Sequence, residues 1–192
     1  MCGVDEAGRG PLAGPVVAAA VIFSDDVFLK DVFDSKQVLP ERREELYHEI
    51  TESAVSYGIG IIDNREIDSV NILQATFLAM NNALSKLKVP PGLVLVDGNF
   101  YKHDSFEIMN IVKGDTKSFS IAAASIIAKV TRDRIMRQFE SDYPNFSFSA
   151  HKGYCTRKHM DEILEYGYTD IHRRSFKLKL LEENEILEEE VL

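Results

Sequence analysis

The apolar positions of the chain fall into short runs and into stripes of helical period. The short runs predict β-strands, because they are rich in β-branched side chains or alternate with small and polar residues. Leu93–Val96 is apolar throughout, which predicts a strand buried on both faces. The predicted strands cover Gly3–Asp5, Val16–Phe23, Ser56–Ile62, Leu93–Val96 and Glu107–Val112.

The stripes predict helices between and after these strands. One helix follows Pro40 and reaches about Ala54, and Pro90 stops the next one. That second helix is expected to bury a stripe of Leu73, Phe77, Met80, Leu84 and Leu87. A longer helix starts near Ser120 and ends before Tyr143, with Lys129, Arg132 and Arg137 expected on its polar side. A short helix around Lys158–Tyr166 and an acidic amphipathic helix over Leu178–Leu192 complete the prediction.

Strands separated by helices indicate an α/β sheet. The first two strands have no helix between them, so at least one pair is antiparallel and the sheet is mixed. A chain of 192 residues predicts a single structural domain. We expect a catalytic core over residues 1–140 and a C-terminal loop and helical segment over residues 141–192 packed on it.

Charge and cysteine content narrow the classes of protein. The net charge of −9 argues against a nucleic-acid partner, but six acids lie in the last eleven residues, and residues 1–181 carry a net of only −3. Basic residues concentrate between positions 129 and 179, which favours an extended polyanion over a small substrate. Two cysteines, no basic leader and no apolar run long enough to span a bilayer predict a cytoplasmic protein without a membrane partner, and we expect a monomer.

Three acidic positions share one setting. Asp5-Glu6, Asp97 and Asp115 each lie where an apolar stretch gives way to a glycine-containing turn. Strand ends of this kind form the ligand crevice of open α/β sheets. Carboxylates without neighbouring histidine or cysteine select Mg²⁺ or Mn²⁺, and two such ions suit phosphoryl chemistry. Each acid taken alone is more often a turn former or a helix cap, so the hypothesis depends on the set.

Neighbouring residues of a strand point to opposite faces of the sheet. Asp5 and Glu6 would therefore share one site only if the pleat breaks there, and Ala7-Gly8 could break it. The histidines show no zinc-ligand spacing with the cysteines, and we expect His159 and His172 to pack or cap rather than bind a metal.

Two further segments are candidates for substrate contact. Gly8-Arg9-Gly10 is either a tight turn or a loop whose backbone approaches a sugar or phosphate, and a backbone contact of that kind could sense a 2′-hydroxyl. Tyr154, between Gly153 and Cys155, is either a partly buried aromatic or a surface for stacking on a sugar or base. Ser35-Lys36 either contacts phosphate or leads into the next helix as solvated chain.

The chain resembles bacterial ribonuclease HII from about Gly3 to Phe176. The resemblance is specific because several independent motifs occur in the same order. They are Gly3-Val-Asp-Glu-Ala-Gly-Arg-Gly-Pro11, Asp34-Ser35-Lys36, Asn71-Ile-Leu-Gln-Ala-Thr76, Val96-Asp97-Gly98-Asn99, Lys113-Gly114-Asp115, the run from Ile121 to Asp133, His151-Lys-Gly-Tyr154 and His172-Arg-Arg-Ser-Phe176.

The resemblance implies a ribonuclease H-like fold, with a five-stranded mixed sheet flanked by helices and a C-terminal helical extension. It implies an endonuclease that cuts the RNA strand of RNA–DNA hybrids and nicks duplex DNA 5′ to single ribonucleotides, using two Mg²⁺ or Mn²⁺ ions. The family's metal-binding carboxylates fall on Asp5, Glu6, Asp97 and Asp115. Its 2′-hydroxyl reader falls on Gly8, Arg9 and Gly10, its stacking tyrosine on Tyr154, and its phosphate-binding loop on Ser35 and Lys36.

Two other hypotheses stay open at this point. The fold could carry a non-catalytic hybrid-binding module, although a binder has no need of four acids beside a polyanion. It could also carry a metal-dependent enzyme acting on a small phosphorylated substrate. The acidic tail either packs on the domain or contacts a partner such as a replication clamp.

Overall fold

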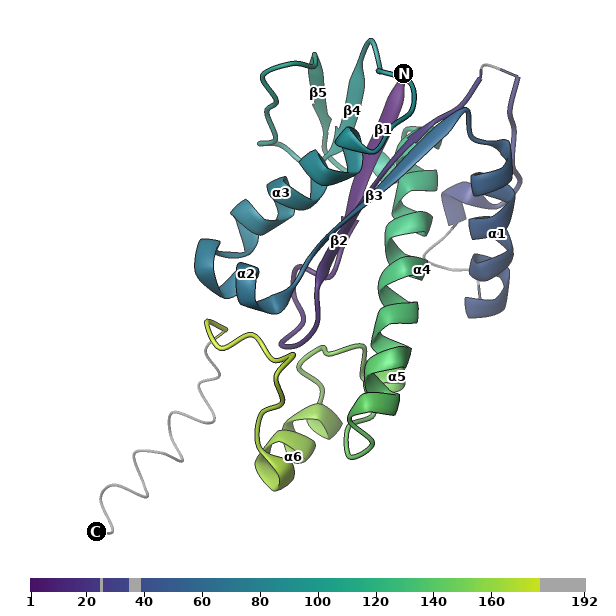
Figure 1. Cartoon of the computed structure of the whole chain (residues 1–192). Helices are drawn as coiled ribbons and strands as arrows, with labels where there is room; N and C mark the ends of the chain where they lie inside the picture. Colours follow the sequence, from purple (N-terminus) through teal and green to yellow (C-terminus); the bar gives the residue numbers. More distant parts are fainter. Residues whose placement is uncertain (25, 35–38, 177–192) are drawn as a thin grey trace.

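A computed structural model describes residues 1–24, 26–34 and 39–176. One five-stranded sheet lies at its centre, with strand order β3-β2-β1-β4-β5 (Figure 1). β1 pairs antiparallel with β2 and parallel with β4, so the predicted mixed sheet is confirmed. The strands are β1 (Cys2–Ala7), β2 (Val16–Ile22), β3 (Ser56–Ile62), β4 (Val94–Asp97) and β5 (Ile108–Ile111).

Helices cover both faces of this sheet. Helices α2 (Asn64–Val70) and α3 (Ile72–Ser85) pack on one face, and α1 (Pro40–Ser53) and α4 (Phe119–Asp142) pack on the other (Figure 1). The short 3-10 helices η1 (Val32–Asp34) and η2 (Gly114–Thr116) precede α1 and α4. No helix among the described residues is long and apolar enough to cross a membrane.

Strand β2 shows why the sheet needs both layers. All seven of its residues are buried. Val17, Ala19 and Val21 pack toward α1 and α4, whereas Ala18 and Ala20 pack toward α3. An apolar run without alternation is the pattern expected of a strand that is covered on both faces.

The sequence prediction missed two short helices, α2 and α5 (Phe148–His151). The signal for α2 was present, because the Asp63 side chain accepts a hydrogen bond from the Glu66 amide and caps the helix. Asn71 follows with φ of 72° and caps α3 through the amides of Leu73 and Gln74. Leu73 was wrongly placed on the buried stripe, since it is 39% exposed in the first turn of α3.

A third apolar cluster forms between α4 and the chain that follows it, around Met136, Phe146 and Phe148, and includes part of α6 (Arg157–Tyr166). Asn64 Nδ2 ties this segment to α2 by donating to the carbonyls of Asp170 and His172, at 2.9 and 3.0 Å. The division into residues 1–140 and 141–192 stays a prediction. The predicted helix over Leu178–Leu192 and the pair Ser35-Lys36 lie outside the described residues.

Candidate active site

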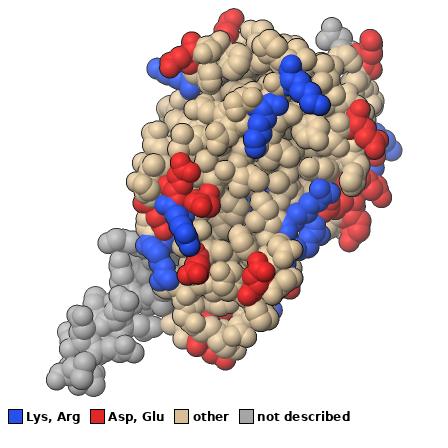
Figure 2. Space-filling view, viewed as in Figure 1, with Lys and Arg blue, Asp and Glu red and all other residues tan. Residues whose placement is uncertain are grey.

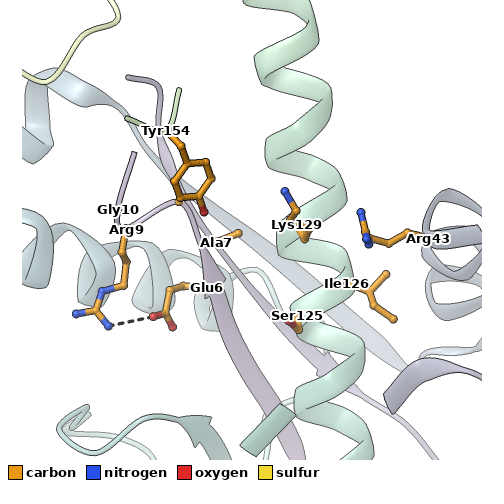
Figure 3. Close-up of a pocket in the computed structure, with 10 residues that line it drawn as sticks. Glu6, Ala7, Arg9, Gly10, Arg43, Ser125, Ile126, Lys129 and Tyr154 are labelled. Carbon is orange, nitrogen blue, oxygen red and sulfur yellow. Dashed lines mark hydrogen bonds and ion pairs between the residues drawn. The ribbon is translucent and has the colours of Figure 1, made fainter. Parts of the chain in front are cut away.

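A cleft of about 430 Å³ opens between the end of β1 and helix α4 (Figure 3). It brings together three of the segments singled out from the sequence, namely Glu6, the Gly8–Gly10 loop and Tyr154. Tyr154 lies on one side of the cleft, and Lys129 and Arg43 lie on the other (Figure 3). The lining residues are Glu6, Ala7, Gly8, Arg9, Gly10, Arg43, Ser125, Ile126, Lys129 and Tyr154.

Asp5 and Glu6 lie on a regular part of β1. The ladder with β2 continues unbroken through Ala7, so the break in the pleat that the sequence interpretation required is absent. Asp5 is 6% exposed, and its Oδ1 accepts the amide hydrogen of Glu6 at 2.7 Å. The Ser125 side chain of α4 lies near the Asp5 carboxylate and lowers its pKa. Asp5 therefore faces α4, and Glu6 lies at the mouth of the cleft.

Asp97 and Asp115 lie beside this pair. β1 and β4 run parallel with Val4 opposite Val96. The next residue of each strand is acidic, so Asp5 and Asp97 lie side by side at the C-terminal ends of these two strands. Asp97 Oδ1 accepts the Gly114 amide hydrogen at 2.7 Å, which ties the end of β4 to the turn that carries Asp115. Asp115 is 6% exposed within η2.

The electrostatics of Asp5 and Glu6 disfavour their charged forms. Burial raises the pKa of Asp5 well above its usual range, and the charges of Glu6 and Asp97 raise it further. Burial also raises the pKa of Glu6, although the guanidinium of Arg9, at 3.2 Å from Glu6 Oε1, opposes that rise. A cation bound near Asp5 and Glu6 would stabilise the ionised forms of both carboxylates and so lower both pKa values.

The donor set fits a hard divalent ion. The buried Oε2 atom of Glu6 has no hydrogen-bond partner among the described residues, and the neighbouring ligands would all be carboxylate oxygens. In the part of the chain that the structure describes, no three His, Cys, Asp or Glu side chains lie close enough to form a ready-made metal centre. Binding an ion would therefore require Asp5, Glu6 and Asp97 to draw together.

Two buried arginines hold the loop between β1 and β2. The Arg173 guanidinium donates to the carbonyl oxygens of Gly8, Arg9, Pro11 and Gly14 at 2.6, 3.1, 2.8 and 3.0 Å. The Arg132 guanidinium donates to the carbonyl oxygens of Ala13, Pro15 and Lys152 at 3.0, 2.9 and 3.0 Å. Each arginine is 1% exposed.

This burial corrects two expectations. Arg132 does not lie on the polar side of α4, and neither Arg132 nor Arg173 contributes to a basic surface. On the face drawn in Figure 2, lysines and arginines lie in separate groups among acidic and uncharged residues rather than in one continuous patch. The distribution of basic residues along the sequence therefore overstated the basic surface.

Gly8 shows how closely these parts are packed. It has φ of 97°, and a Cβ atom there would clash with the Arg132 side chain and the Pro15 carbonyl. Only glycine combines this backbone conformation with so close an approach. The loop and the two arginines therefore form one interlocked unit.

Tyr154 lies over this loop. A Cβ atom at Gly10 would be 3.7 Å from its ring, and the Arg132 guanidinium carbon lies 5.9 Å from the ring centroid. Tyr154 as a whole is 43% exposed, which leaves a surface open to a ligand. The Tyr154 carbonyl accepts hydrogen bonds from the Thr156 amide at 2.8 Å and from His159 Nδ1 at 3.0 Å.

Behind Tyr154, His159 and His172 are buried and joined through their Nε2 atoms at 3.0 Å. The Thr169 amide donates to His172 Nδ1 at 2.9 Å, so the His172 proton lies on Nε2 and points at His159. His159 then carries its proton on Nδ1, where it meets the Tyr154 carbonyl. Both histidines pack and position the chain, as the sequence predicted.

The sequence interpretation did not assign Arg43, Ser125 or Lys129 to the site, although all three line the cleft. Ser125 and Lys129 are four residues apart on α4 and therefore share a face. Lys129 Nζ also pairs with Asp133 at 2.7 Å. The available signal for Ser125 was a single polar residue within the apolar run Ile121–Ala128.

Strand-end carboxylates beside a cleft, on a mixed sheet covered by helices, define a class of α/β proteins suited to metal-assisted phosphoryl chemistry. Comparison with known proteins makes this specific. The family model described as Ribonuclease HII matches residues 2–179. The chain belongs to the ribonuclease HII family, and it is accordingly a type 2 ribonuclease H with the ribonuclease H-like fold.

Individual relatives agree with this assignment. Ribonuclease HII of Caldicellulosiruptor saccharolyticus is 50% identical over 181 residues, covering 94% of this chain and 88% of the relative. The crystal structure of ribonuclease H2 from Pyrococcus horikoshii has a TM-score of 0.77 at 27% identity, covering 97% and 98% of the two chains.

Two further solved structures share the fold. Ribonuclease HII of Archaeoglobus fulgidus, in a complex with PCNA, has a TM-score of 0.74 at 26% identity, covering 93% of this chain and 95% of that one. The Bst ribonuclease HIII, in a complex with Mn²⁺, has a TM-score of 0.71 at 22% identity, covering 91% of this chain and 66% of that one.

Proposed function

We propose that the protein is an endonuclease that hydrolyses the RNA strand of RNA–DNA hybrids and nicks duplex DNA 5′ to single ribonucleotides. The observation that carries this proposal is the placement of Asp5, Glu6 and Asp97 at the same end of the paired strands β1 and β4, beside a cleft lined by Gly8–Gly10 and Tyr154. Water would attack phosphorus and the bond to the preceding 3′ oxygen would break. The products would be a 3′-hydroxyl and a 5′-phosphate.

The four carboxylates would hold two Mg²⁺ or Mn²⁺ ions. Such ions lower the pKa of an attacking water and stabilise the leaving oxygen. Asp5 and Asp97 would lie between the two ion positions, with Glu6 toward the water and Asp115 toward the second ion or the water. The unpartnered Glu6 Oε2 and the raised pKa values of Asp5 and Glu6 support this role. The Mn²⁺ complex of the Bst ribonuclease HIII is consistent with it.

Substrate recognition would use the other side of the cleft. The backbone of Gly8, Arg9 and Gly10 would contact the ribose 2′-hydroxyl, and the exposed Tyr154 ring would stack on the next sugar. Lys129 and Arg43 would face backbone phosphates. Ser35 and Lys36 stay predicted phosphate contacts.

Several wider expectations stay predictions: a monomer, a cytoplasmic location and a contact of the acidic tail with a replication clamp. The archaeal relative bound to PCNA makes the clamp contact a reasonable proposal. A non-catalytic hybrid-binding module was the alternative considered from the sequence; membership of the ribonuclease HII family favours the enzyme, and the same experiment separates the two.

The test is cleavage of duplex DNA that contains one ribonucleotide, beside an all-DNA duplex, with Mg²⁺, Mn²⁺ or EDTA. We expect a metal-dependent nick on the 5′ side of the ribose in the first duplex only. Asp5→Asn is the matched variant, because it keeps the shape of the side chain and removes its charge. We expect it to lose at least about three orders of magnitude in rate while it still binds the duplex. Binding without cleavage by the unaltered protein would indicate the non-catalytic module. A normal rate for Asp5→Asn would refute the metal assignment.

A further inference from the structure

Arg173 makes the largest set of contacts to the loop that follows β1. It lies near the end of the described chain, yet all of its hydrogen bonds in the site go to residues about 160 positions earlier. Its acceptors include the carbonyls of Gly8 and Arg9. These carbonyls belong to the two peptide groups that join Gly8 to Arg9 and Arg9 to Gly10. The side chain is 1% exposed, so water does not compete for these bonds.

The guanidinium stays charged at neutral pH. Burial and the nearby charge of Arg132 lower the pKa of Arg173 to about 9, and the charge of Asp68 acts in the opposite direction. Its planar fork places five donors on three nitrogens and reaches all four carbonyls, whereas the three donors of a lysine ammonium start from a single nitrogen and cannot span the same set.

The direction of these bonds decides which way the loop amides point. A peptide group is planar and trans, so its N–H points opposite to its C=O. The carbonyls of Gly8 and Arg9 point at Arg173. The amide hydrogens of Arg9 and Gly10 therefore point away from Arg173, and both residues line the cleft.

We infer that Arg173 is the positioning residue of the Gly8–Gly10 loop: it turns two carbonyls inward and so presents the Arg9 and Gly10 amides to an oxygen of the ribonucleotide. Arg173 touches no substrate in this arrangement and acts only through the loop. The inference rests on the proposed function, because it takes the loop as the group that distinguishes ribose from deoxyribose.

Arg132 provides a contrast within the same structure. It is equally buried and also donates to three carbonyls, but those carbonyls belong to Ala13, Pro15 and Lys152 rather than to the Gly8–Gly10 peptides. Both arginines therefore support this region, and Arg132 packs against Gly8, but of these two arginines only Arg173 donates hydrogen bonds to the Gly8–Gly10 peptides.

The experiment compares Arg173→Lys and Arg173→Ala with the unaltered protein. Arg174→Ala is the matched control, because it removes the same charge from the neighbouring exposed residue, whose guanidinium lies over Tyr168. The measured quantity is the ratio of Kd for an all-DNA duplex to Kd for the same duplex with one ribonucleotide. Ca²⁺ replaces Mg²⁺ so that the bound duplex is not cut. Cleavage rates and melting temperatures are recorded on the same samples.

We expect both Arg173 variants to lose about tenfold in this ratio, the effect of about one hydrogen bond, with little change in Kd for the all-DNA duplex. Lysine should not restore the ratio, whereas added guanidinium ion should partly restore it in Arg173→Ala. The Arg174→Ala protein should match the unaltered one. Folded variants that keep the full ratio would overturn the inference, and so would equal losses of affinity for both duplexes. An unaltered protein without a preference for the ribonucleotide would instead overturn the proposed function of the loop.

Discussion

The buried pair His159 and His172 should make folding sensitive to mild acid. Burial lowers the pKa of His159 from its usual 6.5 to about 4 and that of His172 to about 3. The folded state therefore favours the neutral rings, and the unfolded chain binds more protons below pH 6.5. The stability that the pair contributes is complete above pH 6.5 and is lost as the pH falls toward the folded-state pKa values.

The size of the effect follows from these pKa values. For one histidine that titrates at 6.5 when unfolded and at about 4 when folded, lowering the pH from 7 to 5 removes about 2 kcal/mol of unfolding free energy. The two rings share one hydrogen bond, so their contributions do not add fully. We take about 2 kcal/mol as the smallest effect expected for the pair.

The variant His159→Gln/His172→Gln tests this reasoning, since glutamine keeps a donor and an acceptor but does not titrate. Urea unfolding followed by circular dichroism at pH 7 and pH 5, in EDTA, gives the free energies. We expect the unaltered protein to lose at least about 2 kcal/mol more than the double variant over this range. Acids with raised pKa values, such as Asp5, increase the free energy of unfolding as the pH falls, and they do so equally in both proteins. His48→Gln, at an exposed position on α1, is the control. Equal losses in the unaltered protein and the double variant would refute the reasoning.

Two further predictions concern stability at other positions. Asp5→Asn should raise the melting temperature at pH 7 in EDTA, because a buried carboxyl whose pKa is raised costs stability when ionised. The gain should shrink as the pH approaches 4, and a lower melting temperature at pH 7 would contradict the electrostatic argument. Gly60→Ala should destabilise the fold by about 2 kcal/mol in urea unfolding, because its Cβ would clash with the backbone carbonyl of Ala79 in α3. Gly92→Ala, with no atom within 4 Å of the new Cβ, should leave stability nearly unchanged, and similar losses in both variants would contradict the packing argument.

Much of the architecture could be predicted because it depends on local pattern. The unbroken apolar run of β2 requires cover on both faces, and the structure supplies it with α3 and α4. The antiparallel pairing of β1 and β2 followed from the absence of a helix between them. The acids at the ends of β1 and β4 could be recognised by their place after apolar runs, although their metal role stays a proposal.

Some features depend on residues that are far apart in the sequence. Gly60 alternates with isoleucines like any small strand residue, and only the crossing of α3 over β3 shows why no side chain fits there. The regular pleat at Asp5 and Glu6 likewise depends on a distant segment, because pairing with β2 continues without a break through Ala7.

The amino-acid sequence by itself determined the strands, most of the helices and the placement of acids at strand ends, because hydrophobic periodicity and turn chemistry act over a few residues. Only the tertiary structure decided that Arg132 and Arg173 lie inside rather than on the surface. In sequence they are ordinary members of basic clusters. Their burial is stable because the loop after β1, more than 100 residues away, turns its carbonyls toward them and replaces the water that a guanidinium would otherwise keep.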